Sequence, residues 1–318
     1  LTVAFFVRIE ARRLNLVTGT EAGQPSTLEA LKSGWHFIIP LAVLIVSLVV
    51  GYTPVRSATF AIFAVIGVSW FTGSPMNLDK CVDAILDALR IMVPTAILLV
   101  AVGLVVNVVT TTGLGNAFSV MIVDWAGGSL MLTLVLVALA SLILGMGLPV
   151  TASYIVLATL AAPALYDLIS QSAMLEALSA PDLPSNVQAV VNLFGGDPMR
   201  ALTEMPAEMR QLVRGELLDP ALVTGMLLSA HLIIFWLSQD SNVTPPVGLV
   251  AFTAAAIAGT RPMLTGLTAW KIAKGLYLVP VLFAFTPLIT GTWNERLTVF
   301  GFACLGLYAL AGILQWHL

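Results

Sequence analysis

The sequence predicts an all-α integral membrane protein, and three observations support this fold class. Of the 318 residues, 58% are hydrophobic and only 10% are charged, and the mean hydropathy is +0.98. A soluble domain carries roughly 25% charged residues, so this chain is too apolar to be one. Several windows hold the about 20 mostly apolar residues that a helix needs to cross a bilayer. Two of these windows are interrupted by glycine, proline and polar residues.

The apolar windows predict the order of the membrane segments. We expect them over 37–53, 57–72, 91–110, 129–146, 149–165, 221–239, 246–259, 272–290 and 297–315. Residues 1–35 are expected to form the end of a preceding helix and a cytoplasmic linker, 36–115 scaffold or arm helices, and 261–318 an interfacial segment and C-terminal helices. The chain begins with Leu1 and lacks the order of a signal peptide, so we expect further residues upstream.

The longest polar stretch, 166–220, is predicted to lie outside the membrane. It holds eight acids and three arginines, and the difference is a net charge of −5. The basic clusters at 8–13, 80–90 and 261–274 favour the cytoplasmic side, which places this stretch on the opposite face. We expect a solvated, partly helical loop, with a docking surface for a soluble partner as the alternative.

The first interruption lies in 116–165, which predicts an interfacial segment followed by a re-entrant hairpin. Gly145, Gly147 and Pro149 stand in the middle of apolar sequence, where a helix cannot continue smoothly. A break inside lipid frees backbone groups that only protein, water or ions can satisfy. Thr151 and Ser153 add hydroxyl groups close to those carbonyls. Such oxygens suit a hard cation such as sodium, and a plain proline-kinked span is the alternative.

The second interruption predicts a discontinuous helix over 221–260. The polar residues Asp240, Ser241, Asn242 and Thr244 lie in its middle and are followed by the helix-breaking residues Pro245, Pro246 and Gly248. Thr244 precedes a proline and is therefore driven out of the helical conformation. A carboxylate inside a membrane is costly unless it is paired, hydrated or ion-bound, so Asp240 is a functional candidate. The alternative is a carboxylate solvated in an aqueous cavity.

The sequence shows none of the common patterns of an enzyme site. His36, His231 and His317 lie far apart, and neither Cys81 nor Cys304 has metal-ligand spacing. Walker A, dinucleotide-binding and nucleophile-elbow patterns are absent from the sequence. We therefore expect no enzymatic activity, no cofactor and no nucleic-acid partner. His231 is either a core imidazole or a contact to a solute.

Two broken segments in one chain are typical of inverted-repeat secondary transporters. The motifs at 112–115, 145–152, 231–236, 240–252 and 265–275 resemble the TRAP transporter fused permeases, in which the small and large membrane subunits are joined. The resemblance covers the chain from about Leu31 to Leu318 and corresponds to the C-terminal half of the large subunit. It departs from the family in lacking the first pseudo-repeat and in the length of 166–220.

This resemblance implies a sodium-coupled elevator transporter of the bacterial inner membrane. Its partners would be the missing N-terminal half of the permease, the lipid bilayer and a periplasmic binding protein that delivers a small organic acid. By analogy, the sodium site would include Gly145, Gly147, Thr151, Asn242 and Thr244. The substrate path would include Ser153, Asp240, Ser241 and His231. The alternatives are an ion-coupled symporter, antiporter or channel without a binding protein, and a membrane subunit that does not transport.

Overall fold

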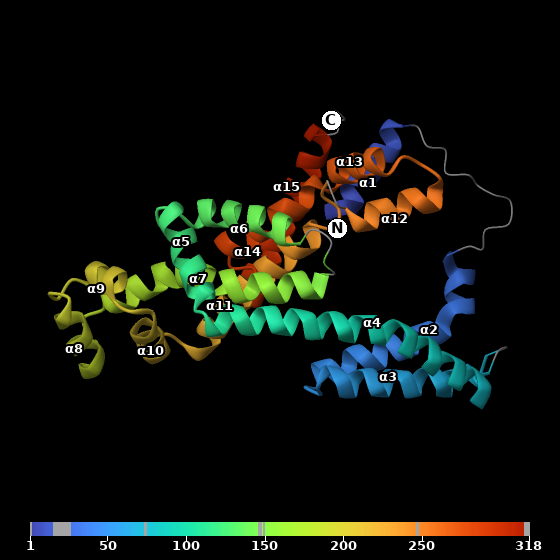
Figure 1. The fold of residues 1–318 in the computed structure, drawn as a ribbon, viewed down its shortest axis with the longest axis horizontal. Helices are drawn as coiled ribbons and strands as arrows, with labels where there is room; N and C mark the ends of the chain where they lie inside the picture. Colours follow the sequence, from blue (N-terminus) through green and yellow to red (C-terminus); the bar gives the residue numbers. More distant parts are fainter. Residues whose placement is uncertain are drawn as a thin grey trace. The chain divides into compact units, whose positions relative to one another are not determined.

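The computed structural model describes residues 2–14, 27–72, 75–145, 148, 150–245 and 248–314 (Figure 1). Every regular element in the described residues is helical, as the sequence predicts. The chain divides into two compact units, one of residues 17–98 and one of residues 1–16 with 99–318. The long helix α4 (Leu78–Thr111) passes from the first unit into the second.

The smaller unit contains a hairpin of two apolar helices, α2 (Thr27–Val49) and α3 (Pro54–Ser69). Gly51 turns the chain between them with a φ of 98°, a conformation that glycine adopts without steric cost. Pro54 then opens α3, and the Thr53 hydroxyl accepts a hydrogen bond from the Arg56 N–H. The hairpin confirms the two adjacent helices predicted near 37–53 and 57–72.

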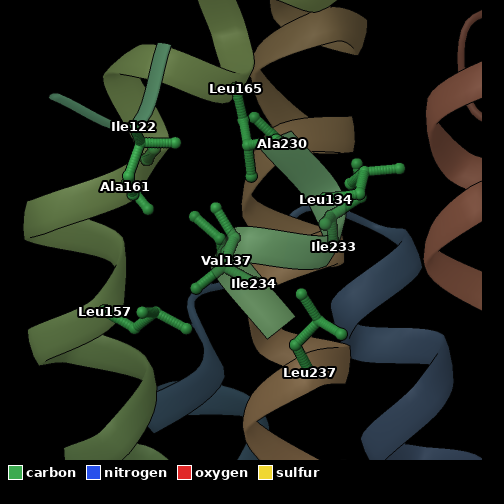
Figure 2. Close-up of a cluster of buried hydrophobic side chains, with 11 residues drawn as sticks. Ile122, Leu134, Val137, Leu157, Ala161, Leu165, Ala230, Ile233, Ile234 and Leu237 are labelled. Atoms are coloured by element: carbon green, nitrogen blue, oxygen red, sulfur yellow. The ribbon is translucent and has the colours of Figure 1, made fainter. Parts of the chain in front are cut away.

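The larger unit is built around α5 (Leu114–Trp125), α6 (Leu130–Leu144), α7 (Val150–Leu178) and α11 (Pro220–Asp240). Their shared core consists of Ile122, Leu134, Val137, Leu157, Ala161, Ala162, Leu165, Ala230, Ile233, Ile234 and Leu237. Figure 2 shows these side chains gathered between α7 and α11, with Leu134 and Val137 contributed by α6 and Ile122 by α5. The alanines allow the helices to approach closely, as small residues do in membrane bundles.

Helix α5 packs tightly on α7 at a proline inside α7. Pro163 has no N–H to offer the Thr159 carbonyl one turn earlier. Gly115 lies against that carbonyl, since a Cβ there would be 3.0 Å from its oxygen. The Ser119 hydroxyl donates to the neighbouring Leu160 carbonyl at 2.6 Å. Small and hydroxyl-bearing residues of α5 thus cover the backbone that the proline exposes.

Four helical segments of the described residues are long and apolar enough to cross a membrane. They are α7, α11, Pro262–Phe285 and α15 (Trp293–Leu314). The third comprises α13 (Pro262–Ile272), the 3₁₀ helix η1 (Ala273–Leu278) and α14 (Val279–Phe285). Helix α1 (Thr2–Arg13) packs against α15 and η1 through the fully buried ring of Phe6. The chain is therefore a multi-pass helical membrane protein.

The polar stretch 166–220 folds into a small helical domain with its own core. It contains the end of α7, α8 (Ser185–Leu193), α9 (Pro198–Glu204) and α10 (Ala207–Leu217). The core is formed by Met174, Leu178, Val187, Val191, Ala201, Leu202, Met205, Val213 and Leu218. This stretch is more ordered than the partly helical loop that its polarity predicts, because its few apolar side chains converge.

Ion pairs to α7 fix this domain. Asp167 accepts hydrogen bonds from Arg214 at 2.5 Å and from Arg210 at 2.9 Å. The guanidinium of Arg214 lies over the Tyr166 ring, 4.1 Å from its centroid, and only 2% of Arg214 is exposed. Arg210 also donates to the Met205 carbonyl. One carboxylate on α7 therefore forms ion pairs with two cations of α10.

We expect Asp167→Asn to lower the free energy of unfolding by about 1–3 kcal/mol. The substitution leaves the buried Arg214 without its counter-ion, and the partial exposure of Asp167 reduces the cost below that of a fully buried pair. Glu204→Gln, which breaks the exposed pair with Arg200, is the matched control and should cost at most about 1 kcal/mol. Thermal unfolding of the purified protein measures both. Equal effects would contradict a structural role for the Asp167 pairs.

Candidate functional site

The first predicted break lies between α6 and α7. Helix α6 ends at Leu144, and Gly145 caps it by donating its N–H to the Ser141 carbonyl at 2.8 Å. Helix α7 begins at Val150. Gly147 and Pro149, two of the predicted site residues, lie outside the described residues. With 15 residues, α6 is about 22 Å long, shorter than the roughly 30 Å hydrocarbon layer.

The second predicted break lies between α11 and α12 (Leu249–Ala258). Helix α11 ends at Asp240, and the residues from Ser241 to Pro245 form turns. Gly248 is buried at the start of α12, where a Cβ would lie 3.1 Å from the Asn242 carbonyl. The break is compact because this glycine lets the chain fold back. Pro246 lies outside the described residues.

The two breaks are in direct contact. A Cβ built on Gly145 would lie 2.6 Å from the hydroxyl of Ser241 and 2.8 Å from its Cβ. No side chain larger than hydrogen fits there without movement, so Gly145, at the C-terminal end of α6, packs directly on the first residue after α11. The sequence predicts each break separately, and the fold brings them to one place.

Three buried polar side chains near these breaks have no hydrogen-bond partner among the described residues. Asp240 is 1% exposed, and neither of its carboxylate oxygens has a partner. The hydroxyls of Ser141 on α6 and Ser153 on α7 are also buried and unpartnered. A buried carboxylate without a partner is unfavourable by several kcal/mol, so this position calls for a cation or a proton.

The remaining predicted site residues differ in their surroundings. Thr151 is exposed in the first turn of α7. The side-chain amide of Asn242 donates to the Ser238 carbonyl at 3.4 Å, in the last turn of α11. His231 lies about 14 Å from Asp240 along α11, by the helical rise of nine residues. Its Nδ1 is 3.0 Å from the Tyr154 hydroxyl, so it bridges α11 and α7.

Thr244 is held from two sides. Its hydroxyl donates to the Asp240 carbonyl at 2.5 Å and pairs with the hydroxyl of Tyr277 at the same distance. Because the single threonine proton goes to the carbonyl, Tyr277 is the donor in the second bond.

The sequence analysis did not identify Tyr277, Tyr154 or Ser141. Pro280, inside an apolar span, is the signal that points to an irregular helix next to Tyr277.

The helix ends at these breaks are suited to bind charged groups. The C-terminal ends of α6 and α11 leave carbonyl oxygens, which favour a cation, and α7 and α12 begin at the breaks with N–H groups, which favour an anion. Broken helices of this kind coordinate ions and solutes in secondary transporters. Within the described residues, no group of three or more His, Cys, Asp or Glu side chains gathers at metal-ligand distance.

The family model of the tripartite ATP-independent periplasmic transporter, DctM component, matches residues 1–293. The chain belongs to this family. The TRAP transporter family inferred from the motifs is thereby confirmed, and the DctM chain is a permease component of a TRAP-type secondary transporter. In such tripartite systems the DctM component normally works with a periplasmic binding protein and a small membrane subunit. No curated protein and no solved structure matches the chain.

Proposed function

We propose that this DctM chain forms one side of a sodium-coupled transport site in a bacterial inner-membrane permease. The observation that carries the proposal is the contact of Gly145 with Ser241, immediately beside the buried, unpartnered carboxylate of Asp240. The contact places the carbonyl ends of α6 and α11 close together. Carbonyl, hydroxyl and carboxylate oxygens are the ligands that hard cations prefer.

The proposed cation region includes Gly145, Gly147, Thr151, Asn242 and Thr244, as the family resemblance implies. We add Asp240 to the cation side, because a buried carboxylate needs a compensating positive charge. Ser153, Ser241 and His231 remain proposed members of the substrate path. An elevator-type movement of both breaks as one body is consistent with their close packing.

The proposed substrate is a small organic acid delivered by a periplasmic binding protein. Its carboxylate would face the N-terminal ends of α7 and α12, where the helix dipole favours a negative charge. The other pseudo-repeat, which we propose to lie in the N-terminal half of the permease, would supply the opposite side of the site. This chain is therefore proposed to transport only as part of the complete permease.

The test is uptake of organic acids by proteoliposomes that contain the complete permease and its binding protein. Replacing external sodium by potassium or choline should lower uptake by about 10- to 100-fold, within the usual range of coupling between two ligands. Unchanged uptake would refute the sodium assignment. Sodium-driven flux without any binding protein would instead support the simpler symporter.

A further inference from the structure

The span Pro262–Phe285 contains a third irregularity, which lies beside the second break. Within it, η1 (Ala273–Leu278) is wound as a 3₁₀ helix between α13 and α14. The cause is Pro280, which has no N–H to donate to the Leu276 carbonyl in the α-helical pattern. That carbonyl instead accepts the Val279 N–H in the tighter pattern. A 3₁₀ stretch within a helix often marks a hinge.

A tryptophan of α11 binds the irregular segment. The indole N–H of Trp236 donates to the same Leu276 carbonyl at 3.0 Å. Its ring meets Phe283 edge-on, with 6.1 Å between the centroids. Trp236 precedes Asp240 by one helical turn, so the two side chains lie on the same face of α11. The face that carries the buried carboxylate is therefore the face that holds η1.

The next residue of η1 extends this attachment to the break. The Tyr277 hydroxyl donates to Thr244, whose own hydroxyl donates to the Asp240 carbonyl. On its other side, η1 is supported by α1, because Gly275 leaves room for the ring of Phe6, which would lie 2.7 Å from a Cβ there. The segment is thus fixed between α1 and α11, with Tyr277 directed at the break.

We propose that Tyr277 is a positioning residue for the cation region: through Thr244 it holds the break of the discontinuous helix beside Asp240. This inference rests on the proposed sodium-coupled function. Without the phenol hydroxyl, Thr244 keeps its bond to Asp240 but loses the contact that fixes the turn from Ser241 to Pro245. The cation region would then be ordered only when the ion binds, so sodium would bind more weakly.

The test compares Tyr277→Phe with wild type in proteoliposomes of the complete permease and its binding protein. The half-saturating sodium concentration should rise by about 3- to 10-fold, the usual effect of losing one hydrogen bond. The maximal rate at saturating sodium should stay within about twofold of wild type, because the phenyl ring still fills the site. The sodium concentration that protects the purified permease from thermal unfolding should rise by the same factor.

Tyr308→Phe is the matched control, since Tyr308 lies in α15 and packs edge-on against Phe5 without a described bond from its hydroxyl. It should leave the sodium dependence unchanged. Trp236→Phe, which keeps an aromatic ring but removes the donor to Leu276, should shift the sodium dependence in the same direction as Tyr277→Phe. If wild-type uptake depends on sodium but Tyr277→Phe leaves the half-saturating sodium concentration unchanged, this inference alone is overturned. Wild-type uptake without sodium dependence would overturn the proposed function together with it.

Discussion

Gly145→Ala is expected to lower uptake by the complete permease about 10- to 100-fold. The new methyl group would lie 2.6 Å from both the Ser141 carbonyl and the Ser241 hydroxyl. The contact to Ser241 can be relieved only if the end of α6 moves away from α11, and the contact to the Ser141 carbonyl only if the last turn of α6 distorts. Overpacking of this kind typically costs 1–3 kcal/mol, about 5- to 150-fold in an equilibrium. The measurement is initial uptake at saturating sodium and substrate, corrected for the amount of permease.

Gly306→Ala is the matched control, because a Cβ at Gly306 in α15 meets nothing within 4 Å. It should leave uptake unchanged. The double variant Gly145→Ala with Ser241→Gly should recover part of the loss, since it removes the contact to the Ser241 side chain but not the one to the Ser141 carbonyl. Wild-type uptake by Gly145→Ala would contradict the close packing of the two breaks.

Local sequence patterns predict both breaks because the interrupting residues act on their own backbone. Pro245 restrains the residue before it, and glycines at 145 and 248 remove side chains at turns. The contact between Gly145 and Ser241 depends instead on the packing of α6, α7 and α11 through their shared core. Residues so far apart in the chain leave no local signal, and the sequence therefore predicts two separate sites where the fold forms one.

The end of α7 shows the same limit. The apolar pattern predicts a membrane segment that ends near 165, because Asp167 follows it. The helix continues to Leu178, since Arg210 and Arg214 of α10 compensate the carboxylate and the small domain packs on the last turns of α7. The compensating charges come from more than forty positions later in the chain. A single-helix pattern contains no information about them.

The irregular helix next to Tyr277 was within reach of sequence reasoning. Pro280 stands inside the apolar run 272–290, and a proline there removes the hydrogen bond to the residue four positions earlier. That rule identifies Leu276 as a carbonyl in need of a new partner. It does not identify Trp236 as the donor or Thr244 as the partner of Tyr277, because both belong to other segments.

The other large effect is expected from Asp240→Asn, which should lower sodium-dependent uptake by at least about 100-fold. The amide keeps the size of the side chain but removes the negative charge, and an intramembrane charge that compensates a cation is worth several kcal/mol. Because the carboxylate is buried and has no partner among the described residues, the protein without sodium is destabilised by it. We therefore expect the variant to be more stable than wild type in sodium-free buffer, by about 1–3 kcal/mol.

Two measurements separate this role of Asp240 from a merely structural one. Thermal unfolding of the purified permease with and without sodium should show stabilisation by the ion in wild type and none in Asp240→Asn, because a ligand stabilises only the state that binds it. Asp182→Asn, in the exposed turn between α7 and α8, is the matched control and should retain both uptake and stabilisation by sodium. The opposite outcome would be an Asp240→Asn variant that is less stable than wild type in sodium-free buffer and is still stabilised by sodium. The carboxylate would then be a structural group. The cation ligands would have to be the carbonyl and hydroxyl oxygens of the two breaks alone.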